Sequence, residues 1–401
     1  MIPFSPPHID DKIIEEVVVA LKSGWITTGP RTKAFEQKIA QYCGIRRVLN
    51  VSSASAGLEL ILRWFGIGPG DEVIVPAYTY TATAEVVLHC GAKPVMVDVG
   101  DDFLITPDNI RKAITPNTKV IIPVDIAGLP CDYDDINRIV NEPAVREHFH
   151  PTNDVQRQLG RILVMADAAH SLGARYRNRR TGALTDITVF SFHAVKNLTT
   201  AEGGAICLNL PEPFDVDALY QELCTFSLHG QSKDALAKTK PGNWRYDVSC
   251  AGYKCNMTDV AAAIGLIEID RYEDMILSRR RAIFEAYTQA FKDDNRFQIP
   301  EYETVDKTSS FHVYALRLRQ ADEARRDAVI QRIFDQEVSV NVHFIPLPML
   351  TCYKKLGYDI RNYPVTYDNY SREISLPVYY DLTDEQVELV IEAVKKAADL
   401  E

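Results

Sequence analysis

Short apolar runs alternate along most of the chain with longer stretches whose apolar residues recur at helical spacing. Runs of this length, rich in β-branched and aromatic residues, are typical of buried strands, and their alternation with helices indicates a mostly parallel sheet. The sequence therefore predicts an α/β domain built on one large sheet. The predicted strands are residues 48–51, 72–75, 93–99, 119–125, 162–166, 187–192 and 205–208.

The pattern changes after residue 259. Residues 259–291 keep helical spacing throughout, which predicts a long connecting helix, and residues 11–21 predict a shorter one near the N-terminus. Strands are predicted at 311–318 and 338–344, and helices at 322–335 and 383–398, the last beginning with a capping box of Thr383 and Gln386. We expect a large domain over 12–270 and a smaller α+β domain over 271–401, with residues 1–11 packed alongside.

Composition narrows the class of protein. The chain has 401 residues, 46% of them apolar and 25% charged, which is typical of a soluble globular protein with more than one core. A net charge of −11 without any basic run argues against nucleic acid as a partner. Eight scattered cysteines without a CxxC pair, and no signal or membrane-length apolar run, predict reduced thiols in a cytoplasmic protein without a metal site. His148 and His150, in a polar segment over 141–161 that reads as a surface insertion, favour a metal only weakly.

The candidate chemistry starts at the stretch TVFSFHAVKNLTTAEGG, residues 188–204. Lys196 lies between two predicted buried strands, so its ammonium group is expected to be partly desolvated. Desolvation favours the free amine, the form that a lysine needs to bind an aldehyde covalently. The alternative is an ordinary solvated lysine, because most lysines are surface charges.

A carboxylate ends another predicted strand. Asp167 follows the apolar run 162–166, at the carboxyl edge where open α/β sheets bind ligands. There it could hold the nitrogen of a pyridine ring protonated, and the ring would then draw electrons from a substrate carbanion. The alternative is that Asp167 caps a following helix. His170 could lie beside the ring or be an ordinary partly buried histidine.

A third motif follows the first strand. Residues 52–57 read SSASAG and precede a helical pattern that starts at Leu58. Small residues and exposed amides at a helix N-terminus can bind a phosphate, although a simple N-cap would look the same. A phosphate-binding turn, a strand-end Asp and a lysine between strands, in this order, together indicate a pyridoxal phosphate site.

These motifs also carry a resemblance. SSASAG, AYTYTATAE, ADAAHSLGA, FSFHAVKNLTTAEGG and GYKCNMTDVAAAIGL, with SGWITTGP near the start and ISLPVYYDLT near the end, resemble the sugar-nucleotide aminotransferases of the DegT/DnrJ/EryC1/StrS family. The resemblance implies the aspartate-aminotransferase fold (fold type I), pyridoxal 5'-phosphate as cofactor and a homodimer with active sites at its interface. The motif style is closest to the branch of UDP-4-amino-4-deoxy-L-arabinose–oxoglutarate aminotransferases, which form the amino sugar with L-glutamate as donor and release 2-oxoglutarate.

The resemblance assigns roles to residues of this chain. Many family members have Asn where Lys254 stands, so the partner residue that contacts the phosphate stays open. Many also have His where Pro348 stands, so the substrate role of that histidine is not carried over, although His343 is present. The implied catalytic residues are Lys196, Asp167 and His170; the implied cofactor-binding residues are these three with Ala54, Ser55, Tyr80, Ser191, His193, Lys254 and Asn256; the candidate substrate contacts are Thr27, Thr28, His229, Lys238, Arg245 and His343.

The implied reaction moves an amino group from L-glutamate to a nucleotide-linked keto sugar, at C4 of a UDP-sugar, for polysaccharide or lipopolysaccharide synthesis. Lys196 argues against a dehydratase-like member, which has His at that place. The open alternatives are amination at C3 of a dTDP-sugar and a regulator that keeps the fold without turnover. A lyase of the cysteine desulfurase type would need a reactive cysteine, and no cysteine here has a suitable setting. The basic loop 226–253 could close over a diphosphate or simply be solvated.

Overall fold

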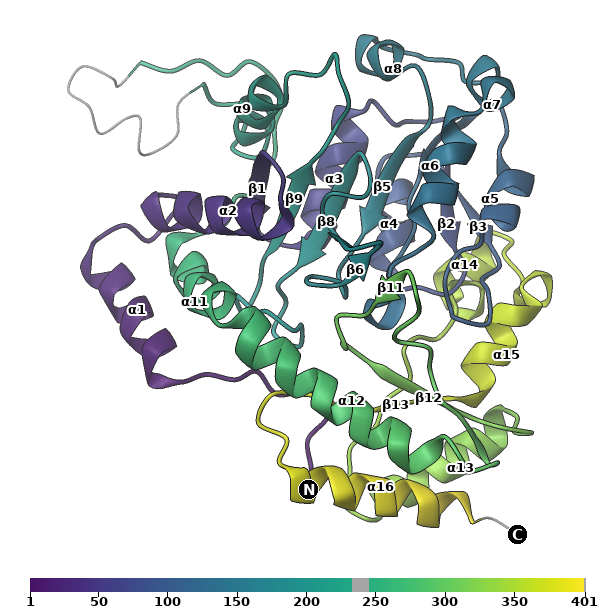
Figure 1. Cartoon of the computed structure of the whole chain (residues 1–401). Helices are drawn as coiled ribbons and strands as arrows, with labels where there is room; N and C mark the ends of the chain where they lie inside the picture. The colour runs from purple at the N-terminus through teal and green to yellow at the C-terminus, as the bar shows by residue number, and fades with distance from the viewer. Residues whose placement is uncertain (233–244, 400–401) are drawn as a thin grey trace.

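The computed structural model describes residues 1–232 and 245–399. At its centre lies a seven-stranded sheet, drawn in purple to teal in Figure 1. Only β9 runs antiparallel to its neighbours, β1 and β8, so the sheet is mixed and mostly parallel as the sequence predicts. In order across the sheet, the strands are β1 (Arg47–Val51), β9 (Gly204–Leu208), β8 (Ile187–Ser191), β5 (Leu163–Asp167), β4 (Thr118–Ile121), β2 (Glu72–Pro76) and β3 (Lys93–Val97).

Helices connect these strands and cover the sheet (Figure 1). One prediction is corrected: the helix after β1 begins at Ala54 and not at Leu58, because Ser53 caps it by accepting a hydrogen bond from Ala56 N at 3.1 Å. The helices of this part are α2 (Pro30–Cys43), α3 (Ala54–Trp64), α4 (Ala82–His89), α5 (Pro107–Ala113), η1 (Ile126–Gly128), α6 (Tyr133–Asn141), α7 (Pro143–Glu147), α8 (Asp154–Leu159) and α9 (Val216–Phe226).

One long helical rod leads away from the large sheet, as the sequence predicts. It consists of α11 (Asp259–Asp270), a π-helical segment, η2 (Tyr272–Leu277), and α12 (Ser278–Phe291). Figure 1 shows it running from beside α2 to the C-terminal part of the chain. Its start also organises the N-terminal segment, because the buried Asp259 carboxylate accepts hydrogen bonds from Gly29 N at 2.8 Å and Thr32 N at 2.9 Å and so caps α2.

The C-terminal part carries an antiparallel sheet of β10 (Phe297–Gln298), β12 (Tyr314–Leu318) and β13 (Glu373–Leu376). The predicted strand at 338–344 is wrong: this stretch makes only isolated bridges, one of them between Asn341 and Ser375. The predicted helices are confirmed, including the capping box of α16. The remaining elements are α13 (Glu323–Phe334), η3 (Leu347–Met349), α14 (Thr351–Lys355), η4 (Ile360–Asn362), α15 (Pro364–Arg372), α16 (Asp384–Ala398) and a small sheet of β11 (Lys307–Thr308), β6 (Arg175–Tyr176) and β7 (Arg179–Arg180).

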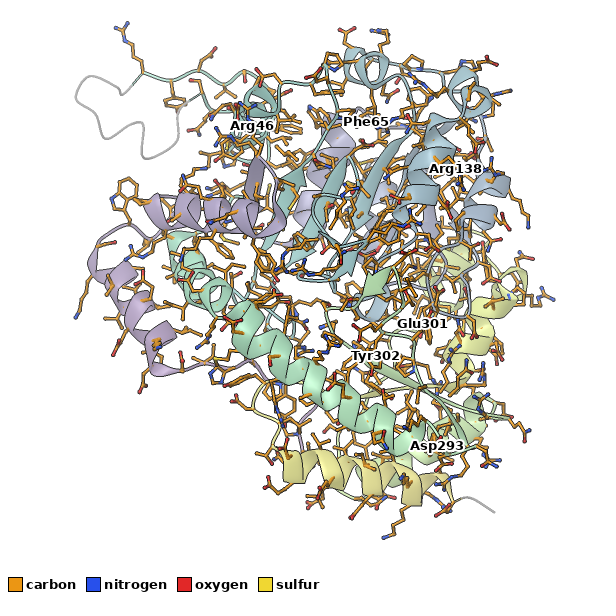
Figure 2. All side chains as sticks on the ribbon, viewed as in Figure 1. Arg46, Phe65, Arg138, Asp293, Glu301 and Tyr302 are labelled. Carbon is orange, nitrogen blue, oxygen red and sulfur yellow. The ribbon has the colours of Figure 1, made fainter. Side chains whose placement is uncertain are left out.

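One end of the predicted polar insertion and the N-terminal residues pack against other parts of the chain. In α8, Gln156 is buried and donates from its side chain to Phe65 O at 2.9 Å, so this end of the insertion packs beside α3; Figure 2 labels Phe65 on that side of the sheet. At the N-terminus, Ile2 pairs with Val338 ahead of α1 (Asp11–Lys22), so the first residues pack against the C-terminal part. The boundary at residue 270 stays a prediction.

Among the described residues, the buried apolar side chains form two clusters. One fills the space between the large sheet and helices α3 to α6, and the other joins α2, α11 and α12 to the small antiparallel sheet. Since apolar burial is the main stabilising contribution, these clusters hold the large sheet and the C-terminal part together. Among the helices of the described residues, none is long and apolar enough to cross a membrane.

Candidate active site

A cavity of about 460 Å³ opens at the carboxyl ends of β5 and β8. Its walls come from the large sheet, from the N-terminal residues Phe4 and Ser5, and from residues 312–378 of the C-terminal part. The volume is in the range of small-molecule sites. The predicted residues that line it are Ala54, Ser55, Tyr80, Asp167, His170, Ser191, His193, Lys196 and His343.

Asp167 is the buried carboxylate of this cavity. Thr83 donates a hydrogen bond to its Oδ2 at 2.8 Å, and Ala169 N donates to its Oδ1 at 3.2 Å. Burial raises the pKa of Asp167, and these two hydrogen bonds and the charge of Lys196 oppose the increase. The helix-capping alternative is wrong, because residues 168–174 form turns and not a helix. Asp167 therefore caps no helix, and its side chain lines the cavity.

Lys196 lies on the connection between β8 and β9. The two strands pair up to Ser191 and Gly204, and Phe192 N donates to Gly203 O at 2.9 Å, which closes the base of the connection. Burial lowers the pKa of Lys196 to about 8, although the charge of Asp167 acts in the opposite direction. The amine is therefore free in about one molecule in ten at pH 7 and in about half of the molecules at pH 8, far more than for a solvated lysine.

The third wall is the start of α3. Ala54 and Ser55 occupy its first turn, where backbone N–H groups and the helix dipole favour an anion, and Ser191 lies nearby at the end of β8. A side chain at Gly204 would place its Cβ 2.7 Å from Ala54 N, so glycine is required for this close approach of β9 and α3. An amine, a buried carboxyl and an anion-binding helix end thus face one cavity, which is the set of groups that a pyridoxal phosphate needs.

Histidines and aromatic rings line the rest of the cavity. His170 accepts a hydrogen bond from Ala127 N at 3.3 Å through Nδ1, and its ring lies 4.3 Å from that of His312. Burial lowers the pKa of both histidines, so both rings are neutral near pH 7. The Tyr80 ring is 60% exposed and lies 5.6 Å from Phe344 at the cavity wall, open to stack on a planar ligand.

Four predicted residues lie outside the cavity lining: Thr27, Thr28, Lys254 and Asn256. We call them the loop group. Asn256 donates to Thr28 Oγ1 at 2.6 Å, and Lys254 Nζ donates to Asn256 Oδ1 at 2.6 Å. Within the described chain none of the four lines the cavity. Thr27 and Lys254 are exposed, and Thr28 and Asn256 are half-buried, so part of this group faces outward from its own chain.

Comparison with known proteins now identifies the chain. The family described as the DegT/DnrJ/EryC1/StrS aminotransferase family matches residues 7–146 and 149–395. The chain belongs to this family. With it, the chain belongs to the pyridoxal-phosphate-dependent aminotransferases, and its fold is fold type I.

Individual relatives of the family agree over nearly the full length. The spore coat polysaccharide biosynthesis protein SpsC of Bacillus subtilis is 35% identical over 410 residues, covering 99% of this chain and 98% of SpsC. Spr1654 of Streptococcus pneumoniae, described as a candidate sugar aminotransferase, has a TM-score of 0.96 and 45% identity in its PMP-form, covering 100% of this chain and 99% of Spr1654. PseC of Helicobacter pylori, an aminotransferase of pseudoaminic acid biosynthesis, has a TM-score of 0.86 and 25% identity, covering 99% of each chain.

The remaining predicted contacts lie away from the cavity or outside the description. His229 and Arg245 are exposed and absent from the cavity lining, and Lys238 lies outside the described residues. His148 Nδ1 lies 2.6 Å from Ala144 O, and the described residues hold no cluster of three metal-ligating side chains. None of the eight cysteines, all of them in described segments, forms a disulfide.

Several polar residues of the site were missed by the sequence interpretation. Thr83 bonds Asp167, and Asn197 Oδ1 lies 2.7 Å from His312 Nδ1. Glu373 and Ser375 lie behind His343. Three of them had a local signal: Thr83 lies within the quoted AYTYTATAE motif, Asn197 is next to Lys196, and Ser375 lies within the quoted ISLPVYYDLT motif. Glu373 and His312 come from positions with no distinguishing pattern.

Proposed function

We propose that this chain moves an amino group from L-glutamate to a keto sugar carried on a nucleoside diphosphate, at C4 of a UDP-sugar. The observation that carries the proposal is that Lys196 and Asp167 line one cavity in a chain of this aminotransferase family. The names of SpsC and PseC, which concern polysaccharide and pseudoaminic acid biosynthesis, support a sugar as the acceptor. The C4 and UDP assignments rest on motif resemblance.

Three parts of the cavity would hold the cofactor. Lys196 Nζ would bind its aldehyde covalently, Asp167 would pair with its ring nitrogen, and the first turn of α3 with Ser191 would bind its phosphate. When bound, pyridoxal phosphate supplies an electron sink that stabilises a carbanion next to the amino nitrogen. Tyr80 and His170 would flank the ring and exclude water from its faces.

The proton transfers fall to Lys196. With a pKa near 8, its Nζ can take a proton from the Cα of the amino donor and later return one to the sugar carbon that receives the amine. Asp167 keeps the region negatively charged, which keeps the pKa of Lys196 from falling further. Neutral His170 and His312 can position donor or acceptor groups without adding charge beside the amine.

The loop group would serve a second copy of the chain. Thr28, Lys254 and Asn256 are bonded to one another but do not line the cavity of their own chain, so we propose that they complete the cavity of the partner in a homodimer. The other sequence-derived substrate contacts, together with the cytoplasm as location and cell-surface sugar synthesis as pathway, remain predictions.

The test begins with spectroscopy. Purified protein given pyridoxal phosphate should develop a visible absorption band, and L-glutamate should remove it. A panel of UDP- and dTDP-linked 3-keto and 4-keto sugars then identifies the acceptor, with the position of the new amine read by NMR. Transfer to a dTDP-sugar at C3 would favour the first alternative. Cofactor binding without transfer to any acceptor would favour a regulator, and a protein that binds no cofactor would overturn the proposal.

A further inference from the structure

His343 reaches the cavity from a segment held along β13. Asn341 N donates to Ser375 O at 3.1 Å, and Ser375 N donates to Asn341 O at 2.8 Å, so this short antiparallel contact fixes the backbone just before His343. The His343 ring lines the cavity and lies 5.4 Å from the ring of Phe4, nearly parallel to it. One edge of the ring therefore faces the small sheet while the ring itself borders the cavity.

A continuous chain of hydrogen bonds runs from that edge into the protein. His343 Nδ1 lies 2.8 Å from Ser375 Oγ, and Ser375 Oγ lies 2.5 Å from Glu373 Oε1. The second carboxyl oxygen, Glu373 Oε2, accepts from His343 N at 3.1 Å. Glu373 and Ser375 are fully buried. The Ser375 hydroxyl has one proton, so it can donate to Glu373 or to His343 but not to both. Whether Glu373 is protonated therefore fixes whether Ser375 donates to His343 Nδ1 or accepts a hydrogen bond from it.

Burial and nearby charges shift the pKa of the Glu373 carboxyl in opposite directions. Arg326 of α13 and Arg317 of β12 act to lower the pKa of Glu373, and buried Tyr78 lies close enough for its own pKa to respond to Glu373. Burial is the largest effect and raises the pKa of Glu373 to about 8. Arg326 itself donates to the main-chain carbonyls of Tyr370 and Glu373, at 2.7 and 3.1 Å, and not to the carboxyl.

The pKa of the His343 imidazole shifts downward, opposite to that of Glu373. Burial, with the charge of Lys196, lowers the pKa of His343 to about 4, so the ring is neutral throughout the working range. His170 and His312, the other titratable groups beside it, are neutral for the same reason. A neutral imidazole has one N–H, which must be on Nδ1 or on Nε2. The carboxyl behind it therefore decides between these two forms.

We propose that Glu373 and Ser375 form a proton relay that sets whether His343 presents a hydrogen-bond donor or an acceptor to the cavity. With Glu373 protonated, its O–H donates to Ser375 Oγ, the serine O–H donates to Nδ1, and the proton of His343 is on Nε2. When Nε2 gives that proton to an acceptor in the cavity, the serine proton moves to Nδ1 and the glutamic acid proton moves to Ser375. The negative charge then lies on Glu373, and His343 stays neutral.

The relay gives the cavity a proton donor whose strength is set by a carboxyl two hydrogen bonds away. If the proposed function is right, the group that His343 meets is the keto oxygen of the acceptor sugar, which accepts a hydrogen bond but cannot donate one. Glu373 and Ser375 do not line the cavity, so they are positioning residues. Because one hydrogen bond contributes about 1 kcal/mol, the donor-to-acceptor change should raise the KM for the acceptor sugar roughly fivefold as Glu373 ionises.

The test reads the ring nitrogens directly. In ¹⁵N-histidine-labelled, cofactor-loaded protein, with signals assigned through His343→Gln, the proton of His343 should move from Nε2 to Nδ1 as the pH rises through about 8. Glu373→Gln should hold the proton on Nε2 at every pH, because its amide N–H can donate to Ser375 Oγ while its oxygen accepts from His343 N. Ser375→Ala should abolish the coupled change.

The outcomes separate the relay from the function. A wild-type His343 that keeps one tautomer from pH 6 to 9 overturns the relay, and this measurement needs neither Glu373→Gln nor Ser375→Ala to fold. A tautomer change in a protein that aminates no sugar supports the relay and counts against the proposed function. In an active enzyme, the fivefold rise in KM should be present in the wild type and absent in Glu373→Gln; a rise of equal size in both also overturns the relay.

Discussion

The cavity residues and the loop group differ in how deeply they are buried, and therefore in what sets the protonation and hydrogen bonding of their side chains. In the cavity, burial shifts the pKa of Lys196 down and that of Asp167 up, so the reactive state of each depends on the walls around it. In the loop group, Lys254 is exposed, Asn256 is half-buried, and the two bond to each other. The comparison teaches that the cavity residues owe their pKa shifts to the walls of their own chain, whereas the loop group has a role in a site only through the proposed second copy.

The largest expected effect comes from removing the cavity lysine. Lys196→Ala should lower amino transfer by roughly 10³-fold or more, because it removes both the nucleophile and the general base. It should also abolish the visible absorption of bound cofactor. Single-turnover assays with L-glutamate measure the first effect, and a spectrum measures the second.

Lys254→Ala is the matched control, since it removes a lysine from the loop group. It should leave the visible band intact and lower the rate far less. If Lys254→Ala were as damaging as Lys196→Ala, or if Lys196→Ala kept the wild-type rate, the division between the two groups would be wrong.

The next largest effect concerns the carboxyl. Asp167→Asn keeps the shape but removes the charge, so the ring nitrogen of the cofactor loses its partner and amino transfer should slow roughly 10²-fold. Thr83→Val, which removes only the hydrogen bond to Asp167, should slow it about tenfold or less, because a neutral hydrogen bond contributes about 1 kcal/mol. Rates ranked the other way would count against a direct role for Asp167.

The pH dependence of covalent cofactor binding tests whether burial lowers the pKa of Lys196. Lys196 has a lowered pKa, about 8, so its amine is protonated below that pH and free above it, and the rate of capture should rise through pH 8. Asp167 raises this pKa, so Asp167→Asn should move the midpoint to lower pH. Stopped-flow absorbance measures both midpoints; a midpoint near 10 would show that Lys196 is a solvated lysine.

The smallest effect tests the loop group. Asn256→Ala should lower activity about tenfold, the order of one lost hydrogen bond to an anion. Mixed with Lys196→Ala subunits, it should recover activity, because the hybrid then has one cavity with an intact lysine and an intact Asn256 from the partner. Refolded mixtures of the two variants measure this, and activity no higher than that of Asn256→Ala alone would place Asn256 at its own chain's cavity.

The sequence predicts the centre of the site better than its surroundings. Lys196 and Asp167 follow buried strands, and the carboxyl edge of a sheet brings strand ends together, so apolar runs alone bring these two residues to the same edge. Glu373 and Ser375 are on a short strand far along the chain, and only the folding of β13 beside residues 341–343 brings them behind His343. The error at 338–344 has the same origin, since alternation predicts a strand but cannot supply its pairing partner.

The most direct test is the absorption spectrum of the wild-type protein during titration first with pyridoxal phosphate and then with L-glutamate. The account predicts a visible band that forms at one equivalent per chain, disappears with glutamate, and fails to form with Lys196→Ala. A protein that stays colourless, or a band that forms equally well in Lys196→Ala, would contradict it.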